Sequence, residues 1–229
     1  MMEEAPAYFD WITETIASHV TGDVLEAGCG TGNGTGSLLR SPHVLSVTAI
    51  DISQHAIDEA QRRNRGSAAS FRVQDLLDLP EASFNSIACG NVLEHIADEE
   101  QALRALKKAL RPGGTLALLV PAHPLLYTLY DREAGHFRRY RRVELRRLLT
   151  SAGFRIDRLF HFNALGALGW FVTYGLLQRQ AVREHQSRNF IRIFGRYVVP
   201  VARSIERFAA PPFGLSLIAL CTKPNKVRD

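Results

Sequence analysis

A glycine-rich turn near the amino terminus holds the residues best suited to bind a ligand. Glu26 is followed by glycines at positions 28, 30 and 32, in the spacing E-x-G-x-G-x-G. Because glycine has no Cβ and adopts positive φ readily, such a turn lets the backbone pass close to a bound molecule. The carboxylate ahead of the turn would repel a phosphate and attract a cation. This arrangement indicates a site for a nucleoside that carries an amino group.

The same spacing argues against a dinucleotide ligand. The dinucleotide fingerprint is G-x-G-x-x-G, and its third glycine permits the close helix–strand packing of a pyrophosphate site. In this sequence, no glycine at positions 28–34 is followed by another glycine five positions later. An oxidoreductase that uses a nicotinamide dinucleotide is therefore the weaker alternative.

Other polar residues stand at the ends of apolar segments, and those segments must position them. Apolar runs at 24–27, 44–50, 71–74 and 86–89 predict four buried strands. Strands that alternate with helices are typical of a doubly wound α/β sheet, in which the carboxyl ends of parallel strands share one edge. Asp51 ends the second run, about 20 positions after the glycines, where an acidic residue can accept hydrogen bonds from ribose hydroxyls.

The alternation continues through the rest of the chain. We expect helices at residues 8–16, 53–64, 98–109 and 143–152, and further strands at 115–120, 154–160 and 214–221. The first of these helices is expected to pack across the mouth of the site. The segment Pro-Gly-Gly at 112–114 is expected to end the third helix ahead of the fifth strand.

The order of these motifs resembles that of the class I S-adenosylmethionine (SAM)-dependent methyltransferases, and is similar to the bacterial type 11/12 group. The resemblance implies one α/β domain over residues 1–229, with a doubly wound, seven-stranded, mostly parallel sheet whose last strand is antiparallel. It also implies SAM as cofactor and S-adenosylhomocysteine as product. The expected cofactor-binding residues are Glu26, Ala27, Gly28, Gly30, Thr31, Gly32, Asp51, Ile52, Asp75, Leu76 and Asn91.

Three residues are candidates for contact with the reacting groups. A sulfonium is already a strong electrophile, so the protein mainly has to align the acceptor and exclude water. A general base is needed only for a hydroxyl or a protonated amine. His136 and His95 are the candidate bases, and Tyr140 could orient the acceptor, although each histidine could equally be structural.

The histidines are scattered and no carboxylate pair stands at ligand spacing, so we expect no metal.

A long connection at residues 121–142 supplies candidate substrate-binding residues, because comparable connections usually have about two to six residues. Six arginines and one glutamate at 138–147 carry a charge of +5, which equals the formal net charge of the whole chain. Arginines among aromatic residues suit planar recognition of a carboxylate or phosphate. No RNA-binding module accompanies them, which argues against a nucleic acid partner. The expected substrate contacts in this connection are His123, Tyr127, Arg138 and Arg139.

A second insertion, at residues 161–213, precedes the last strand. Residues 164–177 carry no charge and include Trp170, and this run is too short to span a bilayer. We expect a helical lid or cap in which Trp170 contacts an amphiphilic or anionic small molecule. A dimer interface, a peripheral membrane contact and extra core are the alternatives. The motifs G-H-x-R-R-Y and P-F-G-L-S beside the two insertions resemble a bacterial subgroup of these methyltransferases.

The composition fits a protein of the cytoplasm. The three cysteines form no C-x-x-C pair, which argues against a disulfide framework and for a reducing compartment. The acidic start of the sequence has no apolar core of the signal-peptide type.

A protein that binds SAM without methyl transfer, or uses it in another reaction, stays an alternative. The acceptor atom and the oligomeric state remain open at this point.

Overall fold

The computed structural model of the protein describes residues 6–171, 196, 198–208 and 210–225. Seven strands form one sheet in the order β3-β2-β1-β4-β5-β7-β6. β7 pairs antiparallel with β5 and with β6, and the other paired strands are parallel, which confirms the predicted sheet. The strands are β1 (Gly22–Ala27), β2 (Val44–Asp51), β3 (Ala69–Val73), β4 (Phe84–Gly90), β5 (Leu110–Pro121), β6 (Arg155–Phe162) and β7 (Ser216–Thr222).

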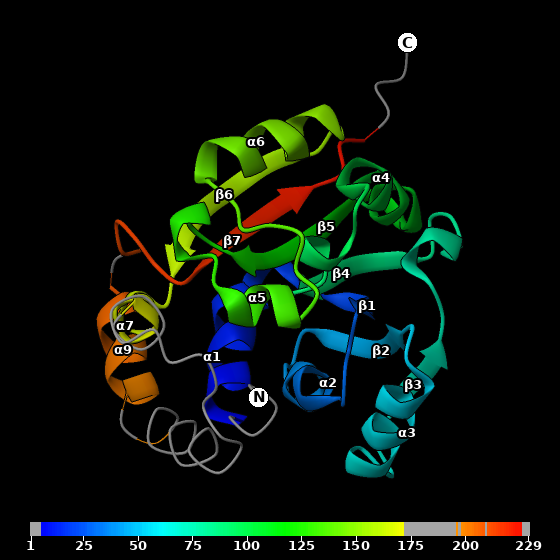
Figure 1. Ribbon diagram of the computed structural model, residues 1–229. Coiled ribbons are helices and arrows are strands. Elements are labelled where there is room, and N and C mark those ends of the chain that lie inside the picture. Colours follow the sequence, from blue (N-terminus) through cyan, green and yellow to red (C-terminus); the bar gives the residue numbers. More distant parts are fainter. Residues whose placement is uncertain (1–5, 172–195, 197, 209, 226–229) are drawn as a thin grey trace.

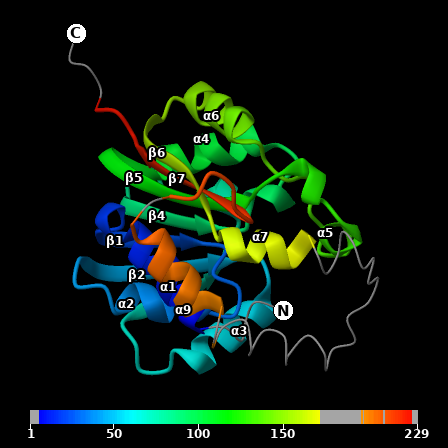
Figure 2. The same ribbon diagram turned by 90° about the vertical axis from the view of Figure 1, so that its left-hand side faces the viewer.

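Helices cover both faces of this sheet, as Figures 1 and 2 show. One face carries α1 (Pro6–Ile16), α2 (Asn33–Leu39), α3 (Gln54–Arg63) and α9 (Val199–Glu206), and the other carries α4 (Glu99–Ala109) and α6 (Arg142–Ser151). The shorter helices are α5 (Leu129–Glu133), α7 (Ala164–Trp170) and the 3-10 turns η2 (Ala17–His19), η3 (Leu76–Asp78), η4 (Leu93–His95) and η5 (Pro124–Leu126).

The two faces of the sheet belong to two separate hydrophobic cores. Successive strand residues point to opposite faces, so Leu116 and Leu118 pack in the α4/α6 core, whereas Ala117 and Leu119 pack in the α1/α9 core. The apolar runs seen in the sequence follow from this burial on both faces.

The strands lie where the sequence predicts them, but β3 and β4 begin two residues earlier than expected, β5 begins five residues earlier, and β6 ends two residues later. Helix α4 ends at Ala109, and Leu110 is already extended and pairs with Phe84, so residues 112–114 lie within β5. Gly113 accommodates a positive φ of 75° there, and its N–H donates to the carbonyl of Lys223. Residues 161 and 162 belong to β6 and not to the helical insertion.

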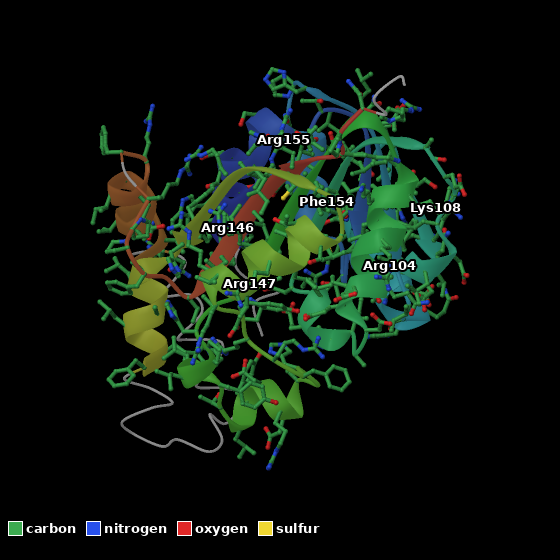
Figure 3. All side chains as sticks on the ribbon, turned by 90° about the horizontal axis from the view of Figure 1, so that it is seen from above. Arg104, Lys108, Arg146, Arg147, Phe154 and Arg155 are labelled. Carbon is green, nitrogen blue, oxygen red and sulfur yellow. The ribbon has the colours of Figure 1, made fainter. Side chains whose placement is uncertain are left out.

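The structure agrees with two simpler expectations, for two arginines and for the cysteines. Arg146 and Arg147 lie on the exposed face of α6, as predicted, and Figure 3 labels them together with Arg104 and Lys108 of α4. The three cysteines are free and buried. Within the described part of the chain, no helix is both long and apolar enough to cross a membrane.

Candidate functional site

The glycine turn lies at the carboxyl end of β1, in the middle of the sheet. Gly28 and Gly30 have φ of 75° and 51°, which an L side chain rarely adopts. A Cβ built on Gly30 would meet no atom within 4 Å, so this glycine faces open space. A Cβ on Gly28 would collide with Val92. The two glycines therefore have different roles, because Gly28 permits packing and Gly30 leaves room for a ligand.

Glu26 supplies a buried charge beside this turn. Its side chain is 9% exposed and accepts a hydrogen bond from the Thr35 hydroxyl. Burial raises the pKa of Glu26 from 4.5 to about 7. An ionised carboxylate in such a place calls for a cationic partner, and an α-amino group bound in the adjoining cavity would provide one.

That cavity, of about 100 Å³, joins the expected cofactor residues of two strands to the first helix. Its lining includes Phe9 and Ile12 of α1, Glu26, Gly28, Cys89 and Asn91. The position of α1 across the mouth of the site, expected from the sequence, agrees with this lining. Asn91 has a positive φ of 54° where β4 ends, and its N–H donates to the carbonyl of Leu119.

The acidic residues that end β2 and β3 lie at the same edge of the sheet. Asp51 Oδ2 accepts the N–H of Gly30 at 2.9 Å, and Oδ1 accepts the N–H of Ser53 at 2.9 Å. Asp51 is thus fixed against the glycine turn, and can present its remaining lone pairs to a ribose. Asp75 is exposed, and its Oδ1 caps η3 through the N–H of Leu77.

The other expected cofactor residues differ in what they can offer. Ile52 is 76% exposed, so its apolar side chain is accessible to a ligand. The side chains of Ala27 and Leu76 are buried in the α4/α6 core. The Thr31 hydroxyl accepts a hydrogen bond from Asn33, and Gly32 caps α2 with φ of 80°. The contacts of these residues with the amino, ribose and base portions of SAM stay a prediction.

A second group of polar side chains follows β4, in η4 and in the 121–142 connection. The rings of His95 and His136 meet edge to face with centroids 4.6 Å apart. His136 Nδ1 lies 3.0 Å from Asp131 Oδ1, which fixes the ring. The structure thus brings together the two candidate bases, although they are 41 positions apart in the sequence.

The expected roles of the arginine pair in substrate binding are not supported. Arg139 has a side chain only 3% exposed, and its guanidinium pairs with Asp131 at 2.8 Å and covers the ring of Trp170. Arg138 pairs with Glu99 at 2.8 Å and also donates to the carbonyl of Ala97. Both guanidinium groups are therefore paired with carboxylates of the protein, Arg139 in the interior and Arg138 in a half-buried position.

Tyr140 is also held within the fold and does not face an acceptor. Its ring is 3% exposed in the α4/α6 core, and its hydroxyl donates to Glu99 at 2.8 Å. Burial is the main cause of its strongly raised pKa, with the charge of Glu99 as the next. We therefore correct the expectation of a catalytic role, since this phenol ties the 121–142 connection to α4.

The remaining substrate candidates lie around α5 and α7. Tyr127 donates to the carbonyl of His136 at 2.7 Å, and Trp170 Nε1 donates to the carbonyl of Leu126 at 3.1 Å. His123, half-buried with φ of 60°, stacks on His161 with centroids 4.9 Å apart. These contacts attach α7 to the 121–142 connection. Nearly half of the expected insertion, at residues 172–195, lies outside the described residues.

The sequence reasoning missed Glu94, which is fully buried between the two histidines and Arg139. The Glu-His pair after the fourth strand could have drawn attention to Glu94, but its burial could not be read from the sequence.

A larger cavity, of about 550 Å³, lies beside β6 among Trp11, Arg158 and Arg203, and no residue of the glycine turn lines it.

Comparisons with known proteins agree with this geometry. A sequence model of the methyltransferase domain matches residues 3–159. An uncharacterized methyltransferase of Mycobacterium tuberculosis is 32% identical over 124 residues, which are 53% of this chain and 62% of that protein. The ubiquinone biosynthesis O-methyltransferase of Xanthomonas euvesicatoria is 29% identical over 152 residues, 58% of this chain and 63% of the relative.

A solved structure extends the likeness to nearly the whole fold. The N-methyltransferase NodS of Bradyrhizobium japonicum, in complex with S-adenosylhomocysteine, superposes with a TM-score of 0.59 at 19% identity, covering 96% of this chain and 86% of NodS. The chain spans between 25% and 63% of the length of the curated relatives it matches. With the domain model matched over more than half of its length, the chain belongs to the methyltransferase-domain family of class I SAM-dependent enzymes.

Proposed function

We propose that this protein transfers a methyl group from SAM to an oxygen atom of a small-molecule acceptor. The observation that carries the proposal is the buried carboxylate of Glu26, which borders the cavity at the carboxyl ends of β1 and β4. Bound SAM would place its ammonium near Glu26 and its ribose near Asp51. SAM supplies the electrophilic methyl group, and the residues of this chain hold the reactants in line.

The name of one relative supports oxygen as the acceptor atom, because the Xanthomonas protein is called an O-methyltransferase. A hydroxyl acceptor has to lose its proton to a base or to water during the transfer. His95 can accept this proton when no metal is bound to its ring. Although the residue is exposed, partial burial of its ring and the charge of His136 lower its pKa, which favours the neutral form.

The insertion supports a bounded acceptor site. Glu206 of α9 accepts the N–H groups of Asn163 and Ala164 at the start of α7, at 2.9 and 2.8 Å. α7 in turn contacts η5 through Trp170. We infer that the described helices of the insertion, α7 and α9, form part of a cap over the acceptor, which would exclude water from the reaction.

The test separates three functions. Calorimetry compares the binding of SAM, S-adenosylhomocysteine and NAD, and we expect the first two to bind and NAD not to. Purified protein is then incubated with SAM labelled in its methyl group and a panel of phenols, alcohols, amines and carboxylic acids. Label in an O-methyl product supports the proposal. SAM binding without transfer to any acceptor would favour the non-methylating alternative, and binding of NAD alone would refute both.

A further inference from the structure

Glu94 is a buried carboxylate that no protein group neutralises directly. It belongs to η4, its exposed fraction is 0%, and neither Oε1 nor Oε2 has a hydrogen-bond partner among the residues that the structure describes. An ionised carboxylate left without partners in a protein interior costs several kcal/mol. Buried charges are normally paired or bind a metal. Glu94 therefore points to a ligand that completes its surroundings.

Two imidazole rings stand next to this carboxylate. Ligand atoms of Glu94, His95 and His136 all lie within 4.8 Å of one another. Asp131 holds Nδ1 of His136, so that Nε2 is the atom left for a ligand. An aspartate that orients the far nitrogen of a histidine is the usual support of a metal-bound imidazole. Asp131 is itself fixed by Arg139 and by the N–H of Thr128.

We propose that Glu94, His95 and His136 bind one divalent transition-metal ion, for which zinc is the natural probe. Two imidazole nitrogens and one carboxylate suit zinc, iron or manganese better than calcium or magnesium, which prefer oxygen ligands throughout. Three protein ligands leave at least one coordination position open. His95 is exposed, so a ligand could reach this cluster from solvent. The scattered spacing of these residues had led us to expect no metal.

The position of Glu94, His95 and His136 suggests which molecule the ion would bind. Asn91 lines the cavity with Glu26, and η4 begins two positions after it. The ion would therefore lie beside the acceptor, where it can bind an acceptor oxygen and orient it toward the methyl group. This role rests on the proposed function, whereas metal binding itself does not.

The experiment measures metal binding without any methyl transfer. Full-length protein is treated with EDTA, dialysed against zinc chloride and analysed for bound zinc. We expect one zinc per chain, and at least a tenfold loss of affinity in both Glu94→Gln and His136→Gln. The matched control is His55→Gln, on the exposed surface of α3, which should bind zinc like the wild type. Cobalt should give a visible absorption band in the wild type that is missing in the two ligand variants.

Stability and cofactor binding make the result decisive. Metal-free Glu94→Gln should unfold at the same or a higher temperature than metal-free wild type, because it no longer buries a charge, and zinc should no longer raise its unfolding temperature. If Glu94→Gln does not fold, His95→Gln replaces it. Absence of bound zinc in the wild type, or unchanged binding in the ligand variants, would overturn the inference. SAM binding in EDTA tests the proposed function separately, since it should persist in either case.

Discussion

Replacing Glu26 by glutamine should remove the part of the pH dependence of SAM binding that this carboxylate causes. Burial raises the pKa of this group from 4.5 to about 7. At about 1.4 kcal/mol per pH unit, the ionised form is destabilised in the folded, ligand-free protein by ~3 kcal/mol. Because the folded pKa lies above the unfolded one, the resulting stability is fully present below pH 4.5. It is lost as the pH rises through about 7.

The affinity for SAM should change in the opposite direction. If the ammonium of SAM needs the carboxylate ionised, the ionised fraction of Glu26 falls from about nine tenths at pH 8 to about one tenth at pH 6, and the affinity falls roughly tenfold. Glu26→Gln should bind SAM about 10- to 100-fold more weakly at pH 8, since a charge-assisted hydrogen bond contributes about 1.5–3 kcal/mol. Its ligand-free form should be more stable than the wild type at that pH.

Calorimetry with SAM at pH 6, 7 and 8, together with thermal unfolding of the ligand-free proteins, measures both effects. The ammonium of SAM titrates alike in every variant, so the difference between variants isolates Glu26. Glu100→Gln, at an exposed position of α4, is the matched control and should keep the pH dependence of the wild type. The reasoning is refuted if Glu26→Gln and the wild type share one pH profile.

Three further changes test other contacts. Gly30→Ala and Gly66→Ala both place a Cβ at positive φ in open space. We expect similar losses of stability, about 1 kcal/mol, whereas only Gly30→Ala should lose SAM affinity, and equal affinities would contradict this in a calorimeter. Arg139→Met leaves the buried carboxylate of Asp131 without its arginine and should cost about 3–5 kcal/mol in denaturant unfolding, a cost that a substrate-binding arginine would not show. Tyr140→Phe should lose about 1 kcal/mol of stability and keep full methyl transfer, and a much slower enzyme would restore the catalytic role.

The sequence predicted well those parts of the site that depend on neighbouring residues. The turn from Glu26 to Gly32 and the cap of α3 at Ser53 are local, and both are found where the spacing placed them. The inner strands followed from continuous apolar runs because they are buried on both faces, whereas β3 and β6 at the two edges of the sheet are partly exposed. The start of β5 was misplaced, because the pairing of Leu110 with Phe84 overrides the turn preference of the residues that follow.

The roles of the arginine and tyrosine residues could not be predicted in the same way. A guanidinium in a sequence does not show whether its partner is a substrate or a carboxylate elsewhere in the chain. The partner of Arg138 and of Tyr140 is Glu99, about 40 positions earlier. The burial of Glu94 depends likewise on the packing of residues 135–139 over η4, where the N–H of Phe137 donates to the Glu94 carbonyl.

Both ends of the 121–142 connection are joined by backbone hydrogen bonds. The N–H of Tyr140 donates to the carbonyl of Pro121 at 2.9 Å, and the carbonyl of Tyr140 accepts the N–H of His123 at 3.0 Å. The segment between them is therefore a loop whose two ends are joined through the backbone. A replacement of residues 124–138 would keep these two backbone bonds, but it would remove Asp131, on which the buried guanidinium of Arg139 depends. We therefore expect a transplanted loop to fold only if the donor sequence supplies a carboxylate at this position.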